Sequence, residues 1–117
     1  MSSADRLARL KKARAAAIAV QEEMERRNDN DPTPANVLKR APILRRADQD
    51  VTDLDLLIND LEGDMQPIAL DADEVDKLDR LAARLNEVIA RDALVGVALE
   101  TVTRVLETAA EVKAVLA

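Results

Sequence analysis

Only six residues in this chain are of the types that interrupt a helix, and they lie far apart. Glycine occurs twice and proline four times in 117 residues. Helix formers fill nearly every stretch between them, and strand formers are scarce because Phe, Tyr and Trp are absent. The interrupting residues are Pro32, Pro34, Pro42, Gly63, Pro67 and Gly96. The sequence therefore predicts an all-α protein, an antiparallel bundle of three to four long helices.

The first helix is predicted over residues 4–27. Ser2 and Asp5 are spaced as at the start of a capping box, although Glu or Gln is the usual residue at the second position. The polar run of residues 28–31 and then Pro32 are expected to end the helix. Apolar residues recur every three or four positions, as on the buried face of a helix, at Leu10, Ala13, Ala17, Val20 and Met24.

A second helix is predicted over residues 34–62. Thr33 offers a capping hydroxyl and Pro34 suits the first helical position, while Gly63 is expected to end the helix in a left-handed conformation. Pro42 predicts a kink, or a short helix that abuts a longer one. The buried face keeps one heptad phase across this proline, through Val37, Arg40, Leu44, Ala47, Val51, Leu54, Ile58 and Leu61.

The third helix is predicted to begin at residue 72. Asp71 caps it with Glu74 three residues on, and Leu70 and Val75 have hydrophobic-staple spacing. Apolar residues then alternate at spacings of three and four, in the manner of a coiled-coil seam, as far as Leu116. We expect one continuous helix over 72–116. The alternative is a break near 91–92 that creates a fourth helix and a bundle of four similar helices.

Charge is strongly segregated along the chain. Residues 1–47 carry a net charge of +5, residues 48–76 a net charge of −11, and residues 77–117 are balanced. If the first two helices form a hairpin about 28–33, residues whose numbers sum to about 61 face each other. The cations of residues 6–14 then lie beside the acids of 48–55, and Glu22, Glu23 and Glu25 beside Lys39 and Arg40. We expect most of the acidic block to pair in this way within the chain.

Some acids remain without a predicted internal partner, and they form a candidate surface for a basic site on another protein. Such a surface would be typical of a small acidic regulator, similar in kind to an antitoxin or a phage inhibitor. The candidate residues are Asp60, Glu62, Asp64 and Asp73.

Composition argues against most chemistry. Without cysteine or histidine the chain has no thiolate nucleophile, no disulfide and no imidazole base or metal ligand, so we expect no enzyme, no metal and no cofactor. No small-molecule substrate is indicated. The lack of aromatic residues and a pI near 4.7 argue against nucleic-acid binding. No apolar stretch is long enough to span a membrane without charge. We expect one domain, in the cytoplasm.

The leading hypothesis is therefore a non-catalytic helical interaction or scaffold protein that self-associates or docks on a partner protein through apolar helix faces. In an antiparallel pair of C-terminal helices centred on Val102, Asp92 of one copy would meet Lys113 of the other, the two charged positions in an otherwise apolar seam. A homodimer is expected. The candidate seam consists of Asp92, Val95, Leu99, Val102, Leu106, Ala109 and Lys113.

Overall fold

The computed structural model describes residues 2–64, 72–73, 76–77, 80–81 and 97–116. It contains helices α1 (Ser3–Asn30), α2 (Pro34–Asp64) and α4 (Leu99–Leu116). Residues 72–73, 76–77 and 80–81 are helical as well, and no strand occurs among the described residues. The all-α fold class is confirmed. None of the helices within the described ranges is long and apolar enough to cross a membrane.

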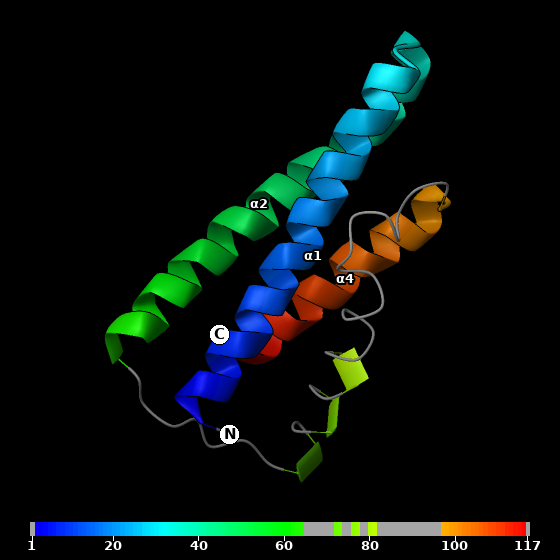
Figure 1. The fold of residues 1–117 in the computed structure, drawn as a ribbon. Helices are drawn as coiled ribbons and strands as arrows, with labels where there is room; N and C mark the ends of the chain where they lie inside the picture. The colour runs from blue at the N-terminus through cyan, green and yellow to red at the C-terminus, as the bar shows by residue number, and fades with distance from the viewer. Residues whose placement is uncertain (1, 65–71, 74–75, 78–79, 82–96, 117) are drawn as a thin grey trace.

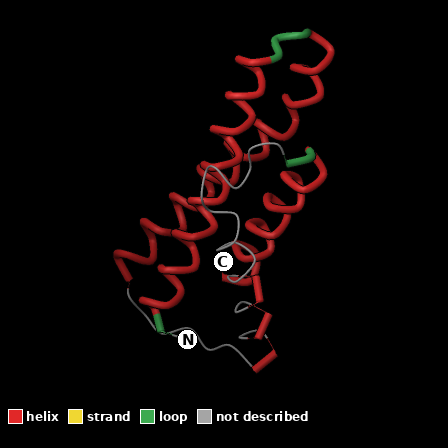
Figure 2. Tube along the Cα trace, turned by 45° about the vertical axis from the view of Figure 1, so that its right-hand side comes forward, coloured by secondary structure: helices red, strands yellow, loops and turns green. Residues whose placement is uncertain are grey.

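Helix α1 lies between the other two helices and packs against both, whereas α2 and α4 contact each other less (Figure 1). The colours in Figure 1 show that α2 and α4 both run antiparallel to α1. Arg6 donates a hydrogen bond to the carbonyl oxygen of Leu116, and Arg27 donates one to that of Val97. These two contacts place the ends of α4 along α1. The turn end of the α1–α2 hairpin projects past the start of α4 (Figures 1 and 2).

The core is built from aliphatic side chains, many of them small. All five residues of the predicted buried face of the first helix are fully buried. Alanine at four of the buried α1 positions allows its neighbours to approach closely, because interaxial distance depends on side-chain size. The buried apolar residues are Leu10, Ala13, Ala16, Ala17, Ala19, Val20, Met24, Ala47, Leu54, Ile58, Leu61, Leu81, Val102, Val105, Leu106, Ala109, Val112 and Leu116.

The predicted start of the first helix is confirmed, but its end is not. The Ser2 hydroxyl accepts a hydrogen bond from the backbone N–H of Asp5 at 3.1 Å, which satisfies one of the unpaired donors at the helix start. Helix α1 then continues through the polar run to Asn30 and closes when the N–H of Asp31 donates to the carbonyl of Arg27 at 2.8 Å. The turn therefore comprises residues 31–33.

Helix α2 begins at Pro34, as predicted, but the capping role expected of the Thr33 hydroxyl is wrong. That hydroxyl donates to Oδ1 of Asp31 at 2.6 Å, while the Thr33 carbonyl accepts from the N–H groups of Asn36 and Val37. The helix is unbroken through Pro42, which excludes the alternative of two abutting helices. The left-handed stop expected at Gly63 is also wrong, because the helix includes Gly63 and extends to residue 64.

The expected continuous helix over 72–116 is wrong. Val97 and Ala98 are not helical, and α4 begins at Leu99 with the Ala98 carbonyl accepting from the N–H groups of Thr101 and Val102. The physical reason is that the Val97 carbonyl is directed to the Arg27 guanidinium, outside a helical ladder. Residue 72 is helical, as predicted. The cap at Asp71 with Glu74, the pair Leu70 and Val75, and the alternative break at 91–92 lie outside the described residues.

The pairing of the first two helices is shifted from the predicted one. Gln21 contacts Asp48 and Arg14 contacts Asp55, so facing residues sum to about 69 and not to about 61. The later end of α1, which moves the connection toward the C-terminus, accounts for part of this shift. In the observed register Arg14 contacts Asp55, which agrees with the predicted pairing of residues 6–14 with the acids of 48–55. Glu23 and Arg40, which were predicted to pair, do not contact each other in this register.

Candidate interaction surfaces

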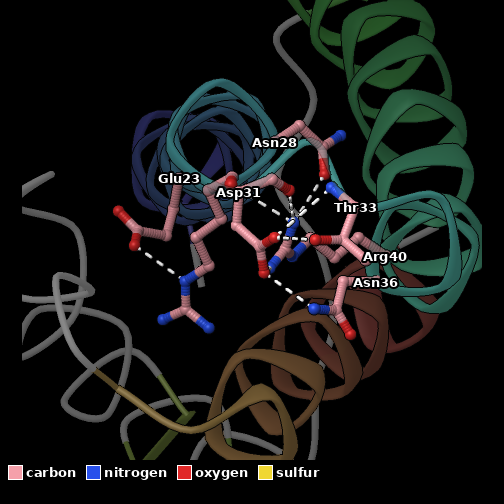
Figure 3. A network of polar contacts seen from close by, with 7 residues as sticks. Glu23, Asn28, Asp31, Thr33, Asn36 and Arg40 are labelled. Atoms are coloured by element: carbon pink, nitrogen blue, oxygen red, sulfur yellow. Dashed lines mark hydrogen bonds and ion pairs between the residues drawn. The ribbon is translucent and has the colours of Figure 1, made fainter.

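Arg40 ties together the turn between α1 and α2 (Figure 3). The residue is buried, and its Nη1 donates to the carbonyl oxygens of Arg27 and Asp31 at 3.2 and 3.0 Å. Nη1 also donates to Oδ1 of Asn28 at 3.1 Å. Carbonyl groups at the end of a helix lack internal partners and carry partial negative charge. The guanidinium therefore closes α1, and it explains why the polar residues 28–30 remain helical.

The carboxylate of Asp31 is the centre of the same network. Its Oδ1 accepts from the Thr33 hydroxyl at 2.6 Å and its Oδ2 from the Asn36 amide at 2.7 Å and from Arg40 at 3.2 Å. The hydrogen bonds from Thr33 and Asn36 stabilise the charged form most, and they lower the pKa of Asp31 to about 2. Every carboxylate oxygen here has a protein partner, so the network fixes the turn.

Glu23 is a buried acid whose partners are on its own helix. It accepts from Arg27 Nε at 2.9 Å and contacts Arg26, three and four residues on. The predicted pairing of Glu23 with Lys39 or Arg40 is therefore wrong. Arg27 in turn donates a hydrogen bond to the carbonyl oxygen of Val97, just before α4. This chain of contacts joins α1 to the start of α4.

Lys113 joins α4 to α2. Its Nζ lies 3.0 Å from Oδ1 of Asp50 and 3.0 Å from Oδ2 of Asp53. Burial, the largest single effect, lowers the pKa of Lys113, but the hydrogen bonds to Asp53 and Asp50 together raise it above its ordinary value. The contact with Lys113 also lowers the pKa of Asp53, assisted by Gln49. Asp50 is buried, and its Oδ2 lacks a partner among the described residues.

Most of these polar groups bind one another. In the described part of the chain, no group of three or more acids, histidines or cysteines is arranged to hold a metal ion. Arg40 and Asp31 bind groups at the turn between α1 and α2, and Lys113 joins α4 to α2. These contacts join the three helices to one another.

The predicted C-terminal seam is already covered within one chain. Val102, Leu106 and Ala109 are fully buried in the core, and Leu99 is half-buried against it. Lys113 contacts α2, as described above, and Asp92 and Val95 lie outside the described residues. A dimer formed through this seam would first have to separate α4 from α1. The seam dimer remains a prediction, but in this structure its apolar residues do not form an open face.

The predicted acidic surface is divided by the structure. Glu62 lies 3.7 Å from Lys11, while Asp60 and Asp73 are exposed. The side chain of Asp64 is not among those described. Acids earlier in the block are engaged within the chain, by Gln21, Arg14 or Lys113, at Asp48, Asp50, Asp53 and Asp55.

The outer face of α2, which was not predicted from the sequence, carries the two most exposed large apolar side chains among the described residues. Leu38 is 72% exposed and Leu56 is 61% exposed. They are 18 residues apart, which is five helical turns, so they lie on one line of the helix about 27 Å apart. That line is opposite the buried face of Ala47 and Leu54. The signal was present in the sequence as two leucines out of phase with the buried heptad pattern.

Comparisons of the chain with protein-family models, with curated proteins and with solved structures find no match. No relative therefore supplies a function for any residue. The functional argument rests on the geometry of the described helices alone.

Proposed function

We propose that the chain is a non-catalytic helical interaction protein that docks on a protein partner through the outer face of α2. This face consists of the exposed residues between the flank that contacts α1 and the flank that contacts α4. They are Leu38, Pro42, Arg45, Gln49, Thr52 and Leu56. The exposure of both leucines on one line of this helix is the observation that carries the proposal. Single exposed leucines are common, but two aligned on an otherwise amphipathic helix favour a contact surface.

The rest of the structure supports this choice of face. The inner faces of α1, α2 and α4 are occupied by the shared core, so they are not open to a partner. Pro42 lies in the middle of the outer face and has no N–H. The helix therefore supplies no backbone donor at this position to the carbonyl oxygen of Leu38, four residues earlier.

Two broader expectations belong to the same proposal. We place the protein in the cytoplasm, and we propose that the complete chain forms a bundle of long helices packed through heptad-like seams. Leu81 supports the second point, because it is buried in the same core as the three helices although it lies outside them in sequence.

A site-specific cross-link tests the proposal, and the absence of native cysteine makes it clean. A photoactivatable cross-linker is attached to a single cysteine introduced by Thr52→Cys on the outer face, or by Glu111→Cys on the exposed face of α4. We expect covalent protein adducts from the first position only, in extracts of the producing cell. They should be lost when Leu38→Asp and Leu56→Asp are added, and kept with Arg104→Glu. Adducts at both positions, or at neither, would contradict the proposal.

A further inference from the structure

We infer that the partner is a second copy of this chain, bound through the outer face of α2 in an antiparallel pair whose two-fold axis is level with Ala47. This inference rests on the proposed function and specifies its partner. A two-fold contact requires a surface that is complementary to itself, because the same residues are presented from both sides. The outer face of α2 meets that requirement in its apolar positions, and the two halves of the helix meet it in their charge.

The two halves of α2 carry opposite charge. The N-terminal half, residues 34–47, has four cations and no acid, and the C-terminal half, residues 48–64, has seven acids and no cation. Within their own chain Arg40 and Arg46 already contact acids and Asp50 is buried. Lys39 and Arg45 are therefore the cations left for a second copy. Two parallel copies would set like charge against like charge along the whole helix. Two antiparallel copies set the basic half of each against the acidic half of the other, which is the arrangement that electrostatic complementarity favours.

Individual residues of the two copies also lie level with complementary residues across the two-fold axis. With the axis level with residue 47, Leu38 of one copy is level with Leu56 of the other. This pair occurs twice in the dimer, so all four exposed leucines have an apolar neighbour. Arg45 comes within one residue's rise, about 1.5 Å along the axis, of Asp48 of the second copy. Both lie toward the flank of the helix that faces α1, so the two side chains are on the same side of the contact.

A second charged pair forms toward the opposite flank. Lys39 lies within two residues' rise, about 3 Å, of Asp53 of the second copy. Asp53 is on the flank that faces α4, as its contact with Lys113 shows. Among the described residues, Lys39 and Arg45 have no partner within their own chain, and both are exposed. They are therefore available to the second copy.

The size of the contact limits its strength. One exposed face of a single helix on each side falls at the low end of specific interfaces, below about 1,200 Å² in total, where association is weak. We therefore expect a monomer–dimer equilibrium that shifts over roughly 10 to 500 µM and weakens as salt is raised, because the charged pairs are exposed.

Mixing two charge-reversed variants tests the inference directly. Arg45→Glu alone places an acid against Asp48 of the second copy, and Asp48→Arg alone places a cation against Arg45. Because like charges repel, each variant should dimerise about tenfold or more weakly than the wild type. When the two variants are mixed, both contacts become attractive, and a heterodimer of near wild-type affinity should form. Sedimentation equilibrium with interference optics measures each state without an aromatic chromophore.

Controls separate this inference from folding defects and from the proposed function. Arg104→Glu and Glu111→Arg make the same charge changes on the exposed face of α4 and should leave dimerisation unchanged. Far-UV circular dichroism checks that each variant keeps its helices. A wild-type chain that stays monomeric at about 1 mM, or a mixture no tighter than its components, would overturn the dimer. Thr52→Cys adducts with a different protein would then still support the proposed function, whereas no adducts would remove both.

Discussion

Helices α2 and α4 both lie antiparallel along α1 and share its apolar core, but the ion pairs along their sides differ in burial. Apart from the contacts of buried Arg40 near the turn, the ion pairs of α2 with α1 are exposed, such as Arg14 with Asp55 and Lys11 with Glu62. Seven of the 18 residues of α4 are buried, and the ion pair of Lys113 with buried Asp50 anchors its last turns to α2. Exposed pairs specify a register at little energetic gain, whereas buried apolar area supplies stability. The shorter helix should therefore be the more sensitive to substitution.

The largest effect should come from the core side of α4. Leu106→Ala removes a fully buried side chain between helices, and we expect a loss of about 2–5 kcal/mol in the free energy of unfolding from the lost burial and the cavity. Urea unfolding followed by far-UV circular dichroism measures it. The matched control is Leu56→Ala on the outer face of α2, for which we expect a change within about 0.5 kcal/mol. Similar losses for the two variants would contradict the packing of α4 described here.

The ion pair of Lys113 should be the next most sensitive. Lys113→Met keeps the aliphatic stem but leaves the Asp50 carboxylate buried without its cation. Because Lys113 is itself 21% exposed, we expect a loss of about 1–3 kcal/mol in the free energy of unfolding, below the full effect of a deeply buried pair. Asp50→Asn added to Lys113→Met should recover part of it. Arg104→Met, an exposed α4 cation, is the control and should change stability little.

The same pair predicts the alkaline limit of the fold. The pKa of Lys113 is raised in the folded state, so its contribution is complete below the ordinary pKa of 10.5 and is lost as the pH rises through the folded value. Lys113→Met should lack this dependence. If wild type and variant lost stability in parallel at high pH, the ion pair would not be the group that titrates.

At low pH the turn and the α2–α4 contact should weaken together. The pKa values of Asp31, lowered to about 2, and of Asp53 lie below their ordinary value of 3.8 in the folded chain. Their contributions are therefore present above pH 3.8 and are lost as the pH falls through the folded pKa of each group, about 2 for Asp31. We expect the urea midpoint to fall over this range, and Asp31→Asn to flatten the profile. An equally steep profile in Asp31→Asn would exclude Asp31 as a source of the acid loss.

Local signals in the sequence predicted the parts of the fold that depend on near neighbours. The Ser2 cap, the start at Pro34 and the buried positions of the first helix follow from spacing and side-chain chemistry within a few turns. The end of α1 did not follow, because the polar run to Asn30 is helical only with the Arg40 guanidinium across the turn. A long-range contact therefore decided a local boundary.

The continuous C-terminal helix failed for a related reason. A heptad pattern records which residues face the core, and it does not record whether one helix or two present them. The exit at Val97 and Ala98 is linked to Arg27, which is 70 residues away in sequence. For the same reason the pattern marked Leu106 and Lys113 as a seam but could not tell an intramolecular contact from a dimer. Leu38 and Leu56 could be recognised as an exposed pair only once the buried face of α2 was known.

The smallest effect should come from the exposed contacts that set the register of α1 on α2. Arg14 Nε lies 2.5 Å from Oδ1 of Asp55, but the two side chains are 40% and 47% exposed, so solvent screens the pair. A double-mutant cycle with Arg14→Ala and Asp55→Ala should give a coupling of at most about 0.5 kcal/mol, and 1 M salt should remove it. Because Arg14 keeps its stem against the helix, Arg14→Met separates lost packing from lost charge. A coupling as large as that between Lys113 and Asp50 would show that α2 and α4 are held to the molecule by the same kind of force, and the contrast drawn between them would fail.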